Sequence, residues 1–165
     1  MVITLCPVVL MNIDIVVDTS RGDSAKGKVA YSLLKKTKYD LAVRANGGSN
    51  AGHTIYHNGI RFATHIIPAG VFFGVQSLIG SGCVLNVKSF FEEIEYLEKL
   101  GIPAGKYIKI AKNTHIVTQN HLDEEADESK VGTTRRGIAP CYRDRYNRVG
   151  IMAESISALQ EYIVD

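Results

Sequence analysis

The sequence has few cysteines, and they form no recognisable pattern. Only Cys6, Cys83 and Cys141 occur among 165 residues, and no pair has the C-x-x-C spacing. An odd number of widely separated cysteines provides neither a disulfide framework nor a zinc site. We therefore expect a reducing compartment, which places the protein in the cytoplasm.

The chain also lacks a strong charge bias. Its 19 Lys and Arg residues against 17 Asp and Glu residues give a formal net charge of +2, which argues against an extended nucleic-acid-binding surface. The arginines between Thr133 and Arg148 are concentrated enough to bind phosphate locally. We expect small anionic ligands and no nucleic acid as partners.

Long hydrophobic runs are absent as well. The first residues, MVITLCPVVLMNI, are apolar but contain no basic residue, include Pro7 and are too short to span a bilayer. We expect neither a signal peptide nor a membrane anchor. Met11 is a candidate start, which would make residues 1–10 an upstream extension. The rest of the chain, without repeats or low-complexity tracts, is expected to form a single domain.

What the sequence does contain is an alternation of strand and helix patterns. Strands are predicted over 13–18, 39–45 and 107–112, a buried strand and loop over 77–86, a hairpin over 54–68, and helices up to 36, over 87–101, 118–130 (helix or lid) and 155–164. The helix over 87–101 has an apolar stripe expected in the core: Phe90, Phe91, Ile94, Leu97 and Leu100. Asn58-Gly59 supplies the positive φ angles of the hairpin turn. This order predicts an α/β fold with a largely parallel central sheet and flanking helices.

The loop before the first helix has the composition of a phosphate-binding loop. Residues 22–29 nearly fit G-x-x-x-x-G-K-[ST], but Val29 lacks the hydroxyl that binds magnesium in that motif. Asp23 could hold Mg²⁺ or approach a bound ring, or it could simply cap the helix. Lys26 and Lys28 could contact phosphate or be solvated.

Two later segments have a similar character. Residues 46–54, NGGSNAGHT, place His53 next to Gly52, where the backbone can approach a ligand. Residues 131–137, VGTTRRG, supply hydroxyls and backbone amides, although such a run also fits an ordinary surface turn. The other histidines lack comparable surroundings, and no role is assigned to them.

Taken in order, Gly22-Asp23, Lys26-Gly27-Lys28, NAGHT and the GTT and RGI groups of GTTRRGI resemble adenylosuccinate synthetase. The resemblance runs over about residues 13–151. It implies the N-terminal part of the synthetase fold, which is P-loop NTPase-like. It also implies a Mg²⁺-dependent ligase of AMP biosynthesis that joins IMP to L-aspartate with GTP as co-substrate, acting as a homodimer.

The same resemblance assigns roles to individual residues. Asp23 would be the general base and a Mg²⁺ ligand, His53 the acid that stabilises the transferred phosphoryl group, and Lys26 would absorb charge beside them. The Gly52 carbonyl would complete the metal site. The implied nucleotide- or phosphate-binding positions are Gly22, Ser24, Ala25, Gly27, Lys28, Asn50, Ala51, Thr134 and, donated across the dimer interface, Arg148.

The sequence departs from the family pattern at several points. Ser24 and Ala25 replace the Glu and Gly of G-D-E-G-K-G-K, and Arg135 replaces a glycine. A phage branch that makes 2-aminoadenylosuccinate from dGMP carries changes in this loop, but here Asp23 is retained, which favours IMP.

Family members are also longer, with their guanine-recognition motif and aspartate-binding loop beyond the position of Asp165. Three readings stay open: an N-terminal fragment of a longer enzyme, a truncated, non-catalytic purine nucleotide-binding module, or a subunit completed by a second polypeptide.

Overall fold

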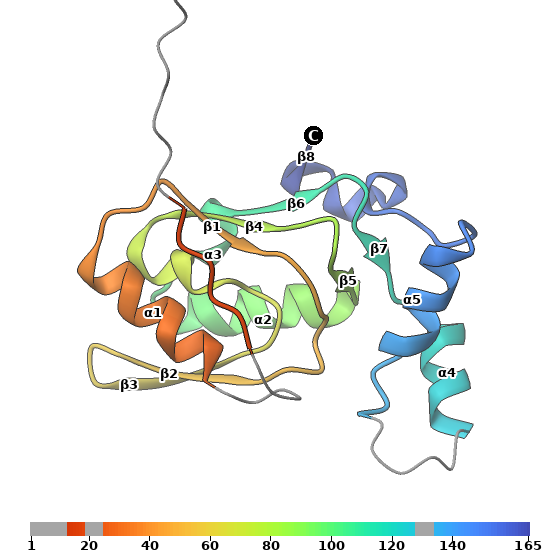
Figure 1. Cartoon of the computed structure of the whole chain (residues 1–165), viewed down its shortest axis with the longest axis horizontal. Helices are drawn as coiled ribbons and strands as arrows, with labels where there is room; N and C mark the ends of the chain where they lie inside the picture. Colours follow the sequence, from red (N-terminus) through yellow and green to blue (C-terminus); the bar gives the residue numbers. More distant parts are fainter. Residues whose placement is uncertain (1–12, 19–24, 128–133) are drawn as a thin grey trace, which may run out of the picture.

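A parallel sheet organises the chain (Figure 1). The computed structural model describes residues 13–18, 25–127 and 134–165. The sheet order is β1-β4-β6-β8, and every neighbouring pair is parallel. Its strands are β1 (Leu41–Arg44), β4 (Gln76–Ile79), β6 (Ile108–Ala111) and β8 (Ile163–Val164). The predicted α/β class is confirmed.

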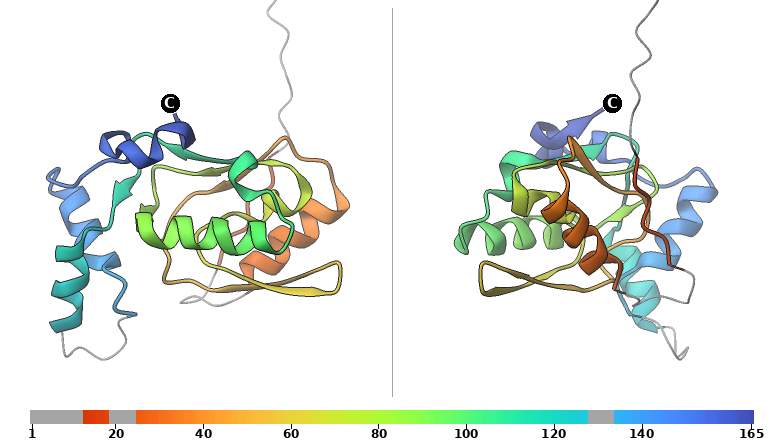
Figure 2. Two further views of the ribbon diagram at one scale, coloured as in Figure 1. Left: turned by 180° about the vertical axis from the view of Figure 1, so that it is seen from behind. Right: turned by 60° about the vertical axis from the view of Figure 1, so that its left-hand side comes forward.

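Helix α2 (Val87–Lys99) runs along one side of this sheet (Figure 2). The Asn86 side chain caps it by accepting a hydrogen bond from the Ser89 N–H at 2.9 Å. Most of its predicted apolar stripe enters the main core together with alternate residues of β4 and β6, but Leu100 at the end of the stripe is 39% exposed. The fully buried members include Phe90, Leu97, Ile79, Ile108 and Ile110.

The predicted hairpin forms beside the sheet. It consists of β2 (His53–His57) and β3 (Ile60–Thr64), with Asn58 and Gly59 at φ angles of 49° and 81°. These values match the two-residue turn that the sequence predicts. Helix α1 (Lys26–Lys36) and the 3₁₀ helix η1 (Ala69–Phe73) pack on the hairpin through an aromatic cluster. Its rings belong to Tyr31, His57, Phe62, Phe72 and Phe73.

Two helices form a separate lobe on the right of Figure 1: α4 (Gln119–Asp127) and α5 (Ile138–Tyr146). They pack on the short parallel pair β5 (Val84–Leu85) and β7 (His115–Ile116). Their small core contains Val84, Val117 and Cys141. The remaining elements are α3 (Ala104–Tyr107), η2 (Ala153–Ser155) and η3 (Ser157–Tyr162). No described helix is long and apolar enough to cross a bilayer.

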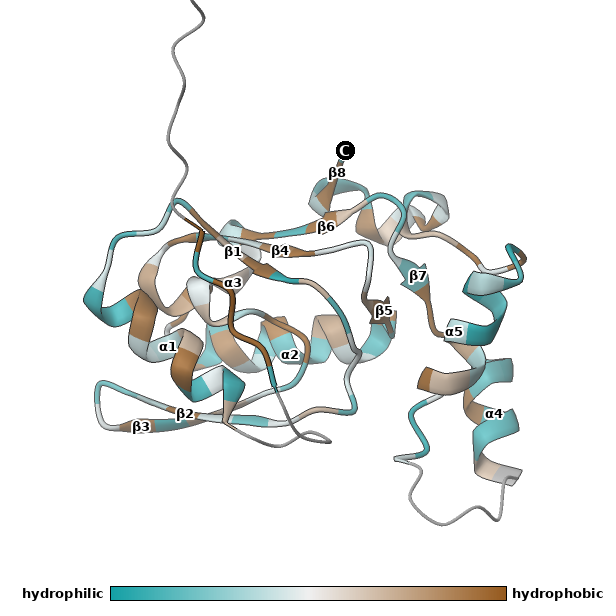
Figure 3. Ribbon diagram, in the orientation of Figure 1, coloured by the Kyte–Doolittle hydropathy of each residue, from teal (hydrophilic) through white to brown (hydrophobic). Residues whose placement is uncertain are grey.

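The strand predicted over 13–18 is wrong for these residues. The segment belongs to no strand, and Ile13, Ile15 and Val17 are 69%, 77% and 73% exposed. It runs beside α1 instead and appears as a brown stretch in Figure 3. A β-branched run fits a pleated surface, but it becomes a strand only where a neighbour offers ladder hydrogen bonds.

The terminal helix predicted over 155–164 is also wrong. The chain forms the short 3₁₀ helix η3 and then enters the sheet as β8. Ile163 pairs with Ile110 and Val164 with Ala111. Pairing with the edge of β6 outweighs the weak local preference for a helix, because propensity is readily overridden by tertiary contacts.

Helices α2 and α5 end in the same hydrogen-bond pattern. The residue with positive φ in this pattern is a glycine after α2 and an arginine after α5. In α2, the N–H groups of Ile102 and Gly101 bond the carbonyls of Leu97 and Glu98, each at 3.0 Å, and Gly101 has φ 84°. In α5, the N–H groups of Val149 and Arg148 bond the carbonyls of Asp144 and Arg145 at 3.0 and 3.1 Å. Both are Schellman motifs, which favour glycine. Arg148 has φ 61° and bears the strain of a side chain there.

We predict that the Arg148→Gly variant is more stable than Arg148→Ala by about 1 kcal/mol, because only glycine relieves the left-handed strain. Comparing these two variants removes the effect of the lost charge at the helix end. Urea unfolding measures the difference. Gly101→Ala should lower the free energy of unfolding by a similar amount, because it places a side chain at the left-handed position of α2. Equal stability of the two Arg148 variants would contradict a strained left-handed conformation at Arg148.

Candidate functional site

The first turn of α1 lies in the described part of the predicted phosphate loop. Ala25 precedes the helix in a left-handed conformation, with φ 62°, and Lys26, Gly27 and Lys28 form the start of the helix. The amide groups of a helix N-terminus carry partial positive charge and can bind an anion. The predicted site residues Gly22, Asp23 and Ser24 lie outside the described residues.

Lys26 already has an anionic partner in this structure. Its Nζ lies 2.6 Å from Oδ2 of Asp18, and the Asp18 side chain is only 10% exposed. The pair therefore joins the segment before the loop to the first turn of the helix after it. Lys28 is exposed.

His53 lies directly against this helix turn. A Cβ built on Gly27 would come within 2.6 Å of His53 Cγ, so glycine is what allows the imidazole to approach the helix backbone. One turn later, the Tyr31 hydroxyl is 3.0 Å from His57 Nδ1. Residues 27 and 31 share a face of α1, and residues 53 and 57 share a face of β2. Helix α1 and strand β2 therefore pack against each other along these faces. This packing brings His53, at the end of NAGHT, to the first turn of α1.

Arg44 holds the residue 46–52 loop. Its guanidinium group donates to the carbonyls of Asn46 at 3.3 Å and Gly48 at 2.8 Å, and also to the carbonyl of His65. Burial lowers the pKa of Arg44, with nearby acidic groups partly opposing the effect. Because Arg44 ends a strand of the parallel sheet, it fixes the loop at the carboxyl edge, where ligands commonly bind in α/β folds.

Within this loop, the predicted ligand positions have their own contacts. Asn50 Oδ1 accepts from the Gly48 N–H at 3.3 Å. The Ala51 carbonyl lies 3.1 Å from His65 Nδ1. Gly52 is exposed, beside the His65 ring. The turn around His65 therefore contacts the residue 46–52 loop at Ala51 and Gly52.

Glu93 fixes that turn from α2. Its carboxylate accepts hydrogen bonds from the N–H groups of His65 at 2.9 Å, Ile66 at 3.0 Å and Ile67 at 3.2 Å. Glu93 is only 7% exposed. A buried carboxylate is tolerated there because three backbone donors replace its hydration.

The α4–α5 lobe carries the last predicted ligand segment. Glu125, which is buried, accepts from the Gly137 N–H at 2.5 Å. His121 Nδ1 accepts from the Thr118 N–H at 3.0 Å, and its Nε2 lies 3.1 Å from Asp144 Oδ2. Hydrogen bonds from His121 and Arg143 lower the pKa of Asp144. The Glu125 contact fixes the residue before α5, three positions after the exposed Thr134, and the His121 contact joins α4 to the last turn of α5.

The structure brings some predicted residues together and separates others. Lys26, Gly27 and His53 meet at the start of α1. The residue 46–52 loop meets the start of α5, where Ile138 Cδ1 would be 2.5 Å from a Cβ on Gly48. Arg148 lies at the opposite end of α5 from Thr134, exposed at the surface.

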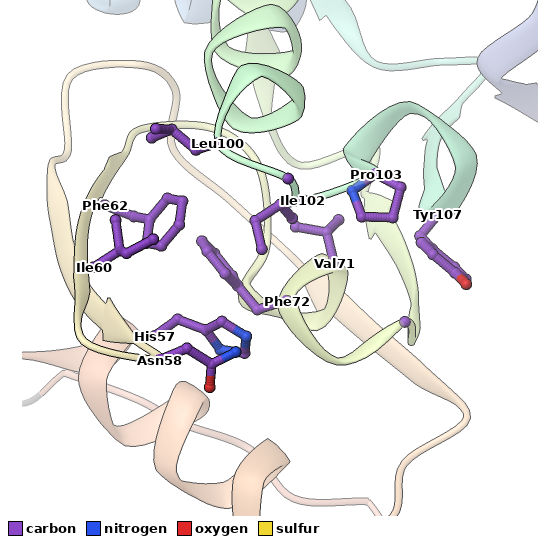
Figure 4. A pocket seen from close by; sticks show the side chains of 12 residues that line it. His57, Asn58, Ile60, Phe62, Val71, Phe72, Leu100, Ile102, Pro103 and Tyr107 are labelled. Carbon is purple, nitrogen blue, oxygen red and sulfur yellow. The ribbon is translucent and has the colours of Figure 1, made fainter.

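A separate apolar hollow of about 360 Å³ lies away from these residues (Figure 4). It opens between the hairpin, η1 and the end of α2. Its lining includes Ile60, Phe62, Phe72, Leu100 and Ile102, and it contains no lysine or arginine. An apolar surface without a fixed cation is a poor phosphate site, so this hollow is not the candidate nucleotide site.

Sequence reasoning missed several residues that shape the site. Glu93 was detectable, since it lies three positions after Phe90 and thus on the predicted apolar stripe of α2. Arg44 was also detectable as a charge at the end of a predicted strand. Tyr142, whose hydroxyl contacts the Gly47 N–H and the Gly82 carbonyl, gave no signal, because no local pattern places it beside these residues. The same holds for Glu125 and its partner Gly137.

We predict that Gly27→Ala destabilises the protein by about 1–3 kcal/mol, because the added methyl overlaps the His53 ring. Glycine to alanine inside a helix normally stabilises by up to about 1 kcal/mol, so the sign is diagnostic. Chemical denaturation gives the value, with exposed Lys35→Ala on the same helix as control. A stabilised Gly27→Ala variant would refute the contact.

We predict that Glu93→Ala lowers the free energy of unfolding by about 3 kcal/mol or more, because three N–H groups lose their acceptor. Glu95→Ala on the same helix is the matched control. Its side chain is 65% exposed and pairs only with Lys99 among the described residues, so its loss should cost about 0.5 kcal/mol or less. Similar melting temperatures for both variants would contradict a stabilising role for the three hydrogen bonds to Glu93.

Known proteins share both the sequence pattern and the fold. Adenylosuccinate synthetase of Thermoanaerobacter sp. strain X514 is 42% identical over 144 residues, which cover 83% of this chain and 33% of the relative. The enzyme of Heliobacterium modesticaldum is 39% identical over 155 residues, covering 90% and 36%. The chain thus spans about a third of the length of the curated relatives it matches.

Solved structures agree. Fully ligated adenylosuccinate synthetase from Plasmodium falciparum matches with a TM-score of 0.70 and 35% identity, over 81% of this chain and 32% of that one. Succinoaminodeoxyadenylate synthetase of cyanophage S-2L, solved with dGMP and dATP, shares the fold with a TM-score of 0.68 and 24% identity, over 87% and 43%. A family model for adenylosuccinate synthetase matches residues 15–163, and the chain therefore belongs to the adenylosuccinate synthetase family.

Proposed function

We propose that this chain provides the IMP-activating part of an adenylosuccinate synthetase. The complete reaction joins IMP and L-aspartate with GTP as phosphoryl donor and Mg²⁺ as cofactor. The observation that carries the proposal is the contact between His53 and Gly27. It unites the NAGHT segment with the start of α1, two motifs of the family that lie well apart in the sequence.

The proposed chemistry has two steps. Asp23 takes the N1 proton of the IMP ring, the O6 atom attacks the γ-phosphorus of GTP, and GDP leaves. The amine of aspartate then attacks C6 and releases phosphate. His53 donates a hydrogen bond to the phosphoryl group during the transfer, where it stabilises negative charge.

Lys26 has to change partner in this scheme. It is paired with Asp18 at 2.6 Å, and a phosphoryl group would compete with that carboxylate for the ammonium. The start of α1 offers backbone amides to the same anion. Asn50 and Thr134 would hold the monophosphate of IMP, and Arg148 would reach the IMP of a second subunit in a homodimer.

Magnesium fits the donor set in part. The Gly52 backbone is exposed on the residue 46–52 loop, and a carbonyl oxygen is a hard ligand that suits Mg²⁺. Asp23, outside the described residues, would be the carboxylate ligand. When bound, the metal supplies positive charge that offsets the charge of the phosphoryl oxygens. The location we propose for this chemistry is the cytoplasm.

A second candidate is a purine nucleotide-binding module without turnover. The proposed monophosphate-binding residues Asn50 and Thr134 both belong to this chain, which is compatible with nucleotide binding alone. Such a module would keep the phosphate contacts of Asn50 and Thr134 but would not form adenylosuccinate. A preference for dGMP over IMP would instead relate the chain to the phage branch.

Calorimetry and a product assay separate these candidates. We expect saturable binding of IMP in Mg²⁺ buffer, weaker binding of dGMP, and formation of adenylosuccinate when GTP and aspartate are added. IMP binding without product would support the module. No binding of either monophosphate would reject both candidates.

For a preparation that forms product, we predict that Asp23→Asn reduces turnover by about 10²–10⁴-fold or more, because it removes the base and a metal ligand. The melting temperature should stay within a few degrees, since asparagine caps a helix about as well as aspartate. Exposed Asp40→Asn is the control, with turnover expected to be unchanged. Near-normal turnover of the Asp23 variant would reject its catalytic role.

A further inference from the structure

Tyr142 joins two segments that are distant in the sequence. Its hydroxyl accepts a hydrogen bond from the Gly47 N–H at 2.9 Å and donates one to the Gly82 carbonyl at 2.8 Å. A hydroxyl has a single proton, so the direction of this relay is fixed. The side chain is half-buried, and burial raises its pKa above the ordinary tyrosine value. The phenol therefore stays protonated at neutral pH and keeps both bonds.

The segments on either side of this relay are closely packed. The Val84 N–H donates to the Gly47 carbonyl at 3.0 Å. A Cβ on Gly82 would lie 2.0 Å from the Ala45 carbonyl oxygen, so these backbones touch. Small displacements of Gly47 are therefore resisted from the strand side by Val84 and from the helix side by Tyr142.

Ile138 makes a second contact from the same helix. Its Cδ1 lies where a side chain on Gly48 would be, 2.5 Å from the built Cβ. Tyr142 and Ile138 are four positions apart in α5 and so share one face of it. That face contacts Gly47 and Gly48, two consecutive residues of the loop that carries Asn50.

The start of α5 is fixed independently by α4. Gly137 donates to Glu125, and a Cβ on Gly137 would come within 3.0 Å of His121 Cβ. Thr134 precedes this anchored glycine by three residues. Helix α5 thus connects the segment with Thr134 to the loop with Asn50, and its geometry sets their separation.

We propose that Tyr142 is a positioning residue that fixes the residue 46–52 loop relative to Thr134. The inference rests on the proposed function in one respect, that Asn50 and Thr134 hold the same monophosphate. Loss of the phenol hydroxyl would leave the Gly47 N–H without its acceptor and free the loop to move relative to α5. The ring itself would stay packed.

The test is Tyr142→Phe, with Tyr146→Phe as the matched control, since Tyr146 lies on the same helix and is 78% exposed. We expect amide hydrogen exchange in residues 46–52 to become about tenfold faster, and the dissociation constant for IMP to rise about tenfold, for Tyr142→Phe only. Exchange in α2 should not change. A general loss of stability would instead accelerate exchange across α5 and β5 equally.

The outcomes are distinguishable. Unchanged loop exchange in Tyr142→Phe, or acceleration shared by the whole lobe, overturns the positioning role. Accelerated loop exchange with unchanged IMP affinity also overturns it. If the wild-type chain binds no IMP, the proposed function fails, while loop exchange still decides whether Tyr142 fixes the loop. If Tyr142→Phe does not fold, Ile138→Val replaces it, because it removes the methyl group beside Gly48 and should loosen the same loop. Unchanged loop exchange in Ile138→Val would then overturn the proposal.

Discussion

The buried carboxylate of Glu93 is the constraint on which the site depends. It accepts hydrogen bonds from three successive backbone N–H groups and so fixes the turn at residues 65–67 against α2. The His65 carbonyl and ring then contact Arg44 and Ala51. This turn holds one side of the residue 46–52 loop, so a buried carboxylate in α2 contributes to the position of the loop. Three donors aimed at one anion make that arrangement stiff.

Three glycines allow side chains of other elements to approach the backbone closely. Gly27 admits the His53 ring, Gly48 admits Ile138, and Gly137 admits His121. Each contact joins a proposed ligand segment to another element at a distance that a side chain would prevent. These contacts join the start of α1 to β2, the residue 46–52 loop to α5, and the residue before α5 to α4.

Backbone strain occurs at or beside several of the proposed site residues. Among the described residues, non-glycine residues with positive φ are Ala25, Asn58, Arg135 and Arg148. Asn58 is in a hairpin turn that favours asparagine, whereas the other three are proposed site positions or their neighbours. Ala25 and Arg135, which the sequence analysis identified as departures from the family pattern, have φ angles of 62° and 53°. Strained residues persist where surrounding contacts determine the backbone, which often happens at functional sites.

The sequence by itself determined the elements with strong local signals: the hairpin turn at Asn58-Gly59, the stripe of α2, strands β1 and β6, and the order of motifs that identifies the family. These depend on periodicity and turn chemistry within a few residues. Tertiary structure alone decided that residues 13–18 form no strand, that Ile163 and Val164 join β6, and that Tyr142 meets Gly47. Each of these depends on a partner distant in the chain, and local patterns show which surfaces a segment can bury but not which neighbour will complete its hydrogen bonds.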